Sequence, residues 1–389
     1  MITERSMIRR FFLRFHSAIR ALTVGVNGVV FICTIFSAYG GCFDPAHVPV
    51  AALAAMMLPI MLLAGIVLMV IDIIVSYRIA FMILASWLIS LPEILIFFPI
   101  NVFSPTLTPE QEARSFTLLT YNCLHLAPYD PSVVGWTNGT ADYILSADAD
   151  VVNLQELEFL SPRKGIKLTV EQVDSLKSRY PYRIIDEEQQ LVVLSKYPVE
   201  QIPLTIPKRS EPCLIQAFRL EIHGTPVNLY NVHLKSIGLS PDDKTLFREL
   251  PGKIKQPDAI EIRDEIHDVK EKLVSKLAQS FVTRGVEARW LRQVIDSIGG
   301  NTIVAGDFND IPGCHAERVI MNGDLHDAYA ENAFGAVITY HDNRFYFRID
   351  HILYGGDLRA VDIRRDTPPW SDHYPLFAKI VLTDNETDK

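Results

Sequence analysis

The chain has 389 residues, of which 49% are hydrophobic and 21% charged, with a formal net charge of −9 and a mean hydropathy of +0.16. The charges are unevenly divided: residues 1–115 hold 7 Lys/Arg and 6 Asp/Glu, whereas the following 274 residues hold 30 and 40, a net charge of −10. This composition excludes a single uniform soluble globule, a disordered chain and a small disulfide-rich secreted protein.

Three apolar stretches in the first 100 residues predict membrane-spanning helices. Ala21–Tyr39 and Val48–Ile71 contain no charged residue, and Ile79–Ile100 contains only Glu93. Each stretch is close to the roughly 20 residues that a helix needs to cross the hydrocarbon core of a bilayer. A cleaved signal peptide is the alternative for the first stretch. Its apolar run is longer than the usual ~7–15 residues, and two further stretches follow it, which disfavours that alternative.

Basic residues in the short flanking segments predict the orientation in the membrane. Residues 1–20 carry five arginines, Phe43–His47 carries no Lys or Arg, and Asp72–Arg78 carries one arginine. We therefore expect a basic cytoplasmic N-terminus over residues 1–20 and a three-span transmembrane anchor over residues 21–100. After an odd number of crossings, the large domain lies outside the cytoplasm. In a bacterium this is the periplasmic side of the inner membrane.

A linker over residues 101–115 leads to a domain over residues 116–389 in which short strands alternate with helical segments. The predicted strands are rich in β-branched and aromatic residues and comprise Phe116–Tyr121, Val151–Gln155, Leu191–Ser195, Leu214–Ile222, Val227–His233, Thr302–Ala305, Phe345–Ile352 and Leu376–Val381. Helices are predicted at Thr140–Ala147 and Val170–Arg179, and a pair of helices within Ala259–Ile298. This order predicts two packed sheets covered by helices.

Polar side chains lie at the end of these strands or directly after them, in six motifs. The motifs are TYNCLH with Asn122, NLQELE with Glu156, NVHLKS with His233, AGDFND with Asp307 and Asn309, FRIDHIL with Asp350, and WSDHYP with Asp372 and His373. Each motif alone has an ordinary interpretation as a turn, a helix cap or a surface group. Their occurrence together, each beside a strand, favours a common cleft.

These residue types suit the hydrolysis of a phosphate ester. A hard divalent cation neutralises the phosphate charge and prefers carboxylate and amide oxygens, which Glu156 and Asn122 would supply. A water molecule must also be oriented and deprotonated, and His373 paired with the carboxylate of Asp350 suits that role.

The remaining motif residues would act on the phosphoryl group. Asp307 and Asn309 are two residues apart, so their side chains would share one face of an extended strand and could both address the nucleophile. His233 could stabilise the phosphoryl oxygens in the transition state.

The ordered set of motifs resembles the endonuclease/exonuclease/phosphatase superfamily, and the resemblance extends from Phe116 to about Thr383. It implies a four-layer α/β/β/α sandwich, here preceded by three transmembrane helices, and Mg²⁺-dependent hydrolysis at phosphorus, with Mn²⁺ as a substitute. It further implies metal ligands at Asn122, Glu156 and Asp372, and catalytic residues at His233, Asp307, Asn309, Asp350 and His373.

We therefore expect a membrane-anchored, metal-dependent phosphoesterase that acts outside the cytoplasm on a phosphodiester or a phosphomonoester. Two substrate classes stay open, nucleic acid and a lipid or its headgroup. The acidic domain offers no general attraction for nucleic acid, and anchoring favours a membrane-derived substrate. No protein partner is predicted, and Ile237–Ser297 is expected to influence substrate choice. The rival hypothesis is an inactive membrane scaffold that retains the fold, although such a protein would be expected to lack Glu156, Asp307 or His373.

Overall fold

The computed structural model describes residues 4–103, 105–126, 137–157, 168–186, 188–205, 213–238, 259–342 and 346–383. The chain forms two compact units, Met1–Ile96 and Phe97–Lys389. The first contains the basic segment and nearly all of the apolar stretches, and the second contains the predicted catalytic domain together with its linker.

The N-terminal unit consists of helices: α1 (Glu4–Ala38), the short 3-10 helix η1 (Gly40–Cys42), α2 (Pro49–Met56) and α3 (Leu58–Phe97). Among the described residues, two helices are long and apolar enough to cross a membrane, Arg10–Ala38 and Leu58–Phe97. The sequence predicted three such helices, and the structure corrects the number to two. The second and third predicted stretches lie mostly within the single element α3.

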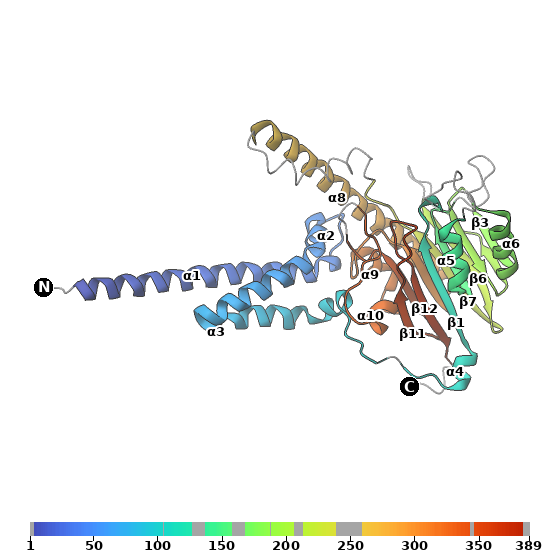
Figure 1. The fold of residues 1–389 in the computed structure, drawn as a ribbon, viewed down its shortest axis with the longest axis horizontal. Helices are drawn as coiled ribbons and strands as arrows, with labels where there is room; N and C mark the ends of the chain where they lie inside the picture. The colour runs from blue at the N-terminus through green and yellow to red at the C-terminus, as the bar shows by residue number, and fades with distance from the viewer. Residues whose placement is uncertain are drawn as a thin grey trace. The chain divides into compact units, whose positions relative to one another are not determined.

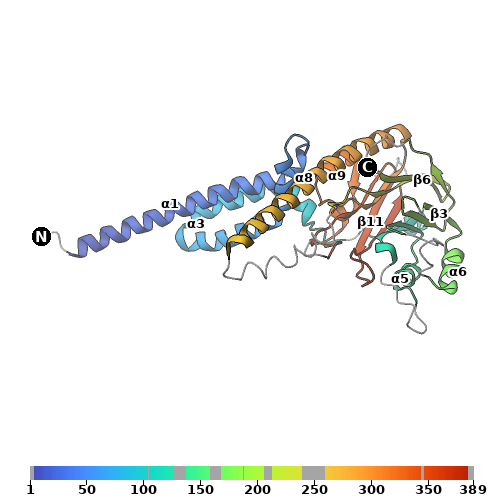
Figure 2. The same ribbon diagram turned by 90° about the horizontal axis from the view of Figure 1, so that it is seen from above.

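Helix α3 bends back on itself at Ser76, where the backbone is extended with φ −170° and ψ 103° (Figures 1 and 2). As a result, Gly65 from its first half lies against Ile83 and Trp87 from its second half. The segment Asp72–Arg78, predicted as a connection between two helices, contains neither glycine nor proline. It stays helical except at Ser76, so the two predicted stretches follow each other as the two halves of α3 without a loop between them.

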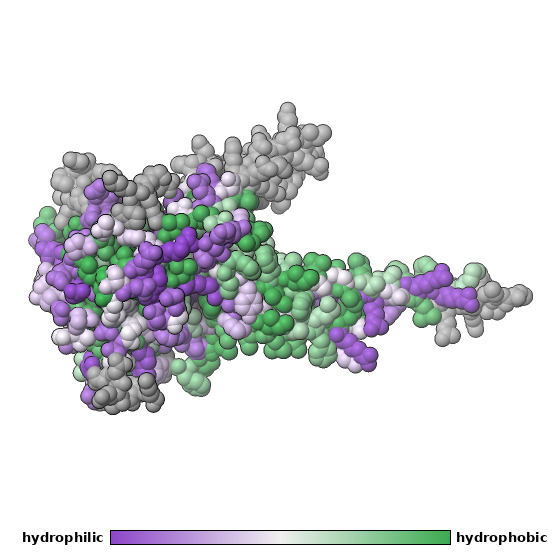
Figure 3. Space-filling model, turned by 180° about the vertical axis from the view of Figure 1, so that it is seen from behind, coloured by the Kyte–Doolittle hydropathy of each residue, from purple (hydrophilic) through white to green (hydrophobic). Residues whose placement is uncertain are grey.

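Large apolar side chains cover the outside of these helices, as the green surface in Figure 3 shows. Well-exposed examples from α1 and α3 are Leu22, Ile32, Leu63, Ile73, Ile74, Phe81 and Leu88. An exposed apolar surface of this extent is unfavourable in water and marks a site of contact with lipid or another apolar partner.

The second unit is built on two six-stranded sheets. The first sheet has the order β11-β12-β1-β2-β4-β3, formed by β1 (Ser115–Asn122), β2 (Val151–Gln155), β3 (Tyr182–Asp186), β4 (Leu191–Ser195), β11 (Leu358–Arg365) and β12 (Leu376–Leu382). The second has the order β5-β6-β7-β8-β10-β9, formed by β5 (Val199–Ile202), β6 (Leu214–Ile222), β7 (Thr225–His233), β8 (Thr302–Asp307), β9 (Leu325–Asp327) and β10 (Asp350–Gly355). Both sheets are mixed, with β1–β2 and β7–β8 parallel.

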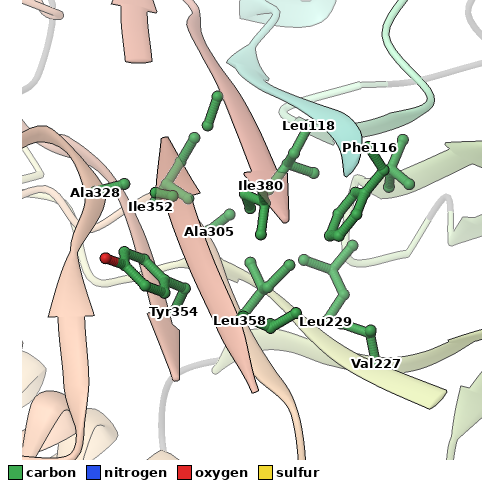
Figure 4. Close-up of a cluster of buried hydrophobic side chains, with 14 of the residues drawn as sticks. Phe116, Leu118, Val227, Leu229, Ala305, Ala328, Ile352, Tyr354, Leu358 and Ile380 are labelled. Carbon is green, nitrogen blue, oxygen red and sulfur yellow. The ribbon is translucent and has the colours of Figure 1, made fainter. Parts of the chain in front are cut away.

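Alternation along the strands divides the apolar side chains between two cores. In β1, Leu118 points into the core between the sheets, which Figure 4 shows with Leu229 and Ile352 from the second sheet. Its neighbour Leu119 points outward, into a core shared with Ile144 of helix α5 (Gly139–Ala147). A strand that is buried on both faces reads as a nearly continuous apolar run, and this explains why β4 could be predicted from sequence.

Helices cover the outer faces of both sheets. On the first sheet these are α5 (Gly139–Ala147) and α6 (Val170–Arg179), and on the second α8 (Ala259–Ile298) and α9 (His315–Met321) (Figure 1). The smaller elements are α4 (Pro109–Ala113), the 3-10 helix η2 (Leu124–Leu126) and α10 (Ala328–Asn332). The predicted four-layer α/β/β/α sandwich is therefore confirmed.

Two element predictions are corrected by the structure. Ala259–Ile298 is a single helix and not a pair, because it contains no proline and only one glycine, Gly285, which a helix tolerates. The strand predicted over Phe345–Ile352 begins only at Asp350 among the described residues, since residues 346–349 lie outside it.

Candidate active site

Strand register places the polar ends of the central strands side by side. In the second sheet, Asp307 of β8 lies directly opposite His233 of β7 on one side and Asp350 of β10 on the other. In the first sheet, Asn122 ends β1 opposite Gln155, and Glu156 follows directly. Because both rows lie at the corresponding edge of their sheets, side chains from the two sheets meet there.

The two sheets are joined at this edge through Asn122. Its amide nitrogen donates to Glu156 Oε1 and to Asp307 Oδ2, each at 3.1 Å. The Asn122 oxygen accepts from the backbone N–H of Leu124 at 3.2 Å. In this arrangement Asn122 positions two carboxylates, and its role as a metal ligand stays a prediction.

His233 lies beside the same two carboxylates. Its Nε2 atom is 3.7 Å from Glu156 Oε1 and 3.7 Å from Asp307 Oδ2. Glu156 is partly exposed and has a left-handed backbone with φ 52°, an uncommon conformation for a residue with a side chain. Such local strain is typical of functional positions, and here the Glu156 carboxylate accepts from the Asn122 amide.

The predicted pair of His373 and Asp350 is present and buried. His373 Nδ1 lies 2.9 Å from Asp350 Oδ2, and its other nitrogen, Nε2, lies 3.6 Å from Asp307 Oδ2. Burial alone lowers the pKa of His373, but the carboxylates of Asp350 and Asp307 outweigh this effect and raise the pKa to about 10. The imidazole is therefore protonated at neutral pH in this arrangement.

Asn309 is close to Asp307, but not in the way that the sequence predicted. Strand β8 ends at Asp307, and Asn309 has a left-handed backbone with φ 51°, so the two residues do not share the face of an extended strand. Instead, the Asn309 backbone N–H donates to Asp307 Oδ1 at 2.8 Å, and the Asn309 amide donates to the carbonyl of Leu234 at 3.0 Å. Asn309 thereby fixes the orientation of the Asp307 carboxylate.

Asp372 is half-buried between Ser371 and His373. Its carboxylate accepts from the Ser371 hydroxyl at 3.4 Å, and its negative charge helps to raise the pKa of His373. Ser371 also donates to the carbonyl of Asn122 at 2.7 Å, which ties the WSDHYP loop to the end of β1. The predicted role of Asp372 as a metal ligand stays a prediction.

Sequence reasoning missed two contributions to the site. His125, inside the TYNCLH motif, has its Nε2 atom 3.6 Å from Glu156 Oε2. Its position three residues beyond the end of β1 was the available signal. The second is a set of buried amides between the sheets, in which Gln155 donates to Asn231 at 2.8 Å and Asn153 donates to the carbonyl of Ala305 at 2.9 Å. These bonds hold the two site edges in register.

Glycine at position 306 is required for the close approach of β7 and β8 beside the site. Gly306 has φ 143°, and a Cβ atom there would overlap the carbonyl of Val232. Because Gly306 precedes Asp307, this approach sets the position of the central carboxylate.

A second buried group of ionisable side chains lies on the opposite face of β10. His351 Nδ1 is 3.0 Å from Glu317 Oε1, and Arg348 pairs with Asp327 at 2.5 Å. Burial raises the pKa of Glu317, but the positive charge of His351 outweighs it and brings the pKa to about 2. Since the guanidinium and the imidazolium already neutralise both carboxylates, this group is a structural ion-pair network.

A protein-family model decides the classification. The Endonuclease/Exonuclease/phosphatase family matches residues 119–373, which contain every one of the motif residues. The chain belongs to this family. Its members are metal-dependent phosphoester hydrolases, and the chain is an enzyme of this class. A second model, for a domain of unknown function (DUF8431), matches residues 20–97. No curated protein matches the sequence.

Solved structures of the family are similar in fold at low sequence identity. A family protein from Bacteroides thetaiotaomicron is 16% identical, with a TM-score of 0.41, covering 69% of this chain and 98% of that one. Truncated TDP2 from Caenorhabditis elegans is 16% identical, with a TM-score of 0.42, covering 69% and 98%. The mannosyl-6-phosphatase Bt3783 of B. thetaiotaomicron is 15% identical, with a TM-score of 0.39, covering 68% and 99%.

The residues of this family member fit a divalent cation. The carboxylates of Glu156 and Asp307 converge on the Asn122 nitrogen at 3.1 Å each, and ligand atoms of Asp307, Asp350 and His373 lie within 4.8 Å of one another. Asp350 Oδ1 is buried without a hydrogen-bond partner among the described residues, which an anionic oxygen tolerates poorly. Carboxylate oxygens are the ligands that Mg²⁺ prefers, so Glu156, Asp307 and Asp350 are the candidate donors.

Proposed function

We propose that the chain is a membrane-anchored, Mg²⁺-dependent phosphoesterase that cleaves a phosphodiester or a phosphomonoester outside the cytoplasm. The observation that carries this proposal is the position of Asp307, whose buried carboxylate lies within 4 Å of Asn122, His233 and His373 at once. A carboxylate, two imidazoles and an amide therefore surround one point. Groups of these kinds can orient a water molecule for attack on a phosphate and can stabilise the charge that develops there.

The carboxylates of Glu156 and Asp307 are the residues that would hold the cation, since each lies 3.1 Å from the same Asn122 nitrogen. When bound, Mg²⁺ supplies positive charge that offsets the charge of the phosphate and its leaving group. The partial exposure of Glu156 suits an ion that keeps several of its water ligands. Mn²⁺, with the same preference for oxygen, would substitute.

The chain's own residues then divide the proton transfers. The sequence assigned water activation to His373, but a group with a pKa of about 10 holds its proton at neutral pH. We therefore assign proton acceptance to Asp307, which Asn309 orients through its backbone N–H. His373, held by Asp350, donates from Nε2 to a phosphoryl oxygen, and His233 approaches the phosphate from the other side.

The membrane assignment rests on α1 and α3. Their exposed apolar surfaces are unfavourable in water, and the arginines Arg10, Arg14 and Arg20 lie exposed along the first part of α1, which favours a cytoplasmic N-terminus. Since α3 folds back at Ser76, its two halves can each cross the bilayer. Together with α1 this gives three crossings, and the catalytic unit would then lie on the outer face of the membrane. In a bacterium this is the periplasmic face of the inner membrane.

The substrate is proposed to be either a nucleic acid or a lipid with its headgroup. The family comprises nucleases and phosphatases, so both phosphodiesters and phosphomonoesters stay open as substrates. The net charge of −10 beyond residue 115 disfavours a long polyanion, whereas anchoring concentrates the enzyme near lipid headgroups. The inactive-scaffold alternative is disfavoured because Glu156, Asp307 and His373 lie together in the cleft.

The test uses the full-length protein in detergent with bis(p-nitrophenyl) phosphate and p-nitrophenyl phosphate as probes. We expect hydrolysis with Mg²⁺ or Mn²⁺ and none in EDTA. Asp307→Asn should lower kcat by about 10³-fold or more, as expected for a residue that acts only in the transition state. Asp362→Asn, at an exposed carboxylate of β11, is the matched control. Activity in EDTA, or an active Asp307→Asn, would contradict the proposal. A reporter that is active only outside the cytoplasm, fused after Lys389, tests the orientation.

A further inference from the structure

An exposed apolar patch lies where the chain enters the catalytic unit. It consists of Ile100, Val102, Phe103 and Phe334, which are 64%, 68%, 91% and 70% exposed. We call these four residues the entry patch. Elsewhere in this unit the described apolar side chains of comparable exposure are scattered, with Val170 as one example. A group of four is large enough to indicate contact with an apolar partner.

The entry patch is a fixed part of the catalytic unit, although most of it comes from the linker segment. Ile100 and Phe334 form an antiparallel β-bridge. The Asn101 backbone N–H donates to the carbonyl of Ala333 at 3.1 Å, and the Gly335 N–H donates to the carbonyl of Pro99 at 2.7 Å. The segment after α3 therefore runs beside the end of α10 (Figure 1), and the two cannot separate without loss of these bonds.

The covalent connection limits how far the entry patch can lie from α3. Helix α3 ends at Phe97, and a chain spans at most ~3.4 Å per residue, so Ile100 lies within about 10 Å of the helix end and Phe103 within about 20 Å. Residues 94–109 contain no charged side chain. If α3 lies in a bilayer, the entry patch is at the interface, whatever the orientation of the rest of the unit.

We propose that the entry patch inserts into the surface of the lipid bilayer and docks the catalytic unit on it. This inference rests on the membrane anchor of the proposed function. The occupant is lipid and not a protein because the patch continues directly from an apolar helix through an uncharged segment. Aromatic and aliphatic side chains beside the end of a membrane helix favour the headgroup boundary.

Docking through this patch brings the active site close to the membrane surface. Thr339 comes five positions after Phe334, so their Cα atoms lie at most about 17 Å apart. The Thr339 hydroxyl accepts from the Asp350 backbone N–H at 3.1 Å, and the ring of Tyr340 lies 5.0 Å from that of His373. The docked unit therefore holds its catalytic cleft near the interface, where a phosphate ester of a lipid headgroup can reach it.

The experiment measures contact with lipid directly. The full-length protein is placed in bilayer nanodiscs made either with ordinary or with acyl-brominated phospholipids, since bromine quenches tryptophan only at close range. Phe103→Trp and Phe334→Trp are each introduced into a Trp87→Phe background. Tyr182→Trp, on a β3 residue of 42% exposure, is the matched control. Docking predicts a loss of at least a third of the added fluorescence at positions 103 and 334, and no change at 182.

Failure of docking and failure of the anchor give different results. The unaltered protein carries Trp87 within α3, and its other tryptophans are also present in Trp87→Phe, so the difference in quenching between these two proteins reports on the anchor alone. Quenched Trp87 with an unquenched Phe103→Trp overturns docking and leaves the anchor intact, whereas an unquenched Trp87 overturns both. A Phe103→Trp signal that is shielded from acrylamide but not quenched by bromine would assign the patch to a protein partner and overturn the lipid assignment.

Discussion

The charge pair of Asp350 and His373 can be tested by the single change Asp350→Asn, which keeps the shape of the side chain and removes its charge. A rise in the pKa of His373 from 6.5 to about 10 corresponds to about 5 kcal/mol in favour of the protonated imidazole, shared among its carboxylate neighbours. Loss of one buried partner of such a pair costs about 3–5 kcal/mol. We expect Asp350→Asn to lower the free energy of unfolding by about 3 kcal/mol near neutral pH.

The pKa shift of His373 also predicts how the free energy of unfolding changes with pH. The pKa of His373 is higher in the folded state than in the unfolded state, so its contribution is complete below about pH 6.5 and is lost as the pH rises through about 10. The stability difference between the parent protein and Asp350→Asn should therefore shrink over this interval. It is measured by urea unfolding of residues 97–389, the compact catalytic unit, with Asp362→Asn as the control.

The same change should lower kcat, because the remaining asparagine holds the imidazole without stabilising its charge. We expect a loss of about 10²–10³-fold, with a pH–rate profile whose upper limb moves to lower pH. A stability difference that stays constant from about pH 6.5 to 10, or an upper limb that does not move, would refute the assignment of a protonated His373.

Further predictions concern the residues that position the site, the buried ion-pair network beside it and the metal ion. Gly306→Ala should lower the free energy of unfolding by roughly 2–4 kcal/mol and kcat by about 10²-fold, because its Cβ would push against Val232 and displace the adjacent Asp307, as urea unfolding and steady-state kinetics would reveal. Glu317→Gln should cost about 3 kcal/mol at neutral pH by leaving His351 buried without its partner. Since the pKa of Glu317 is lowered from 4.5 to about 2, this cost should diminish as the pH falls through that interval, and a cost independent of pH would contradict the pairing. EDTA should abolish turnover, and added Mn²⁺ should restore it; recovery with Zn²⁺ alone would argue against an oxygen-rich metal site.

Local sequence determined most of the secondary structure and the identity of the site. Val151–Gln155, Leu191–Ser195 and Val170–Arg179 begin and end where the sequence predicted, because runs rich in β-branched residues and a capped helix are specified by neighbouring residues. Strands with mixed patterns, such as β3 and β9, were not predicted. Their positions depend on pairing with β4 and β10, which lies outside any local window.

Only the tertiary structure decided what the site residues do to one another. The sequence predicted that Asn122 binds a metal ion and that His373 activates water, but it did not show their neighbours. The packing of two sheets directs the Asn122 nitrogen toward two carboxylates and places His373 between two anions. The reason is that a pKa and a hydrogen-bond direction depend on burial and on charges from distant strands. In the same way, composition alone divided the chain into an apolar and an acidic part, whereas the bend at Ser76 arose from packing between the two halves of α3.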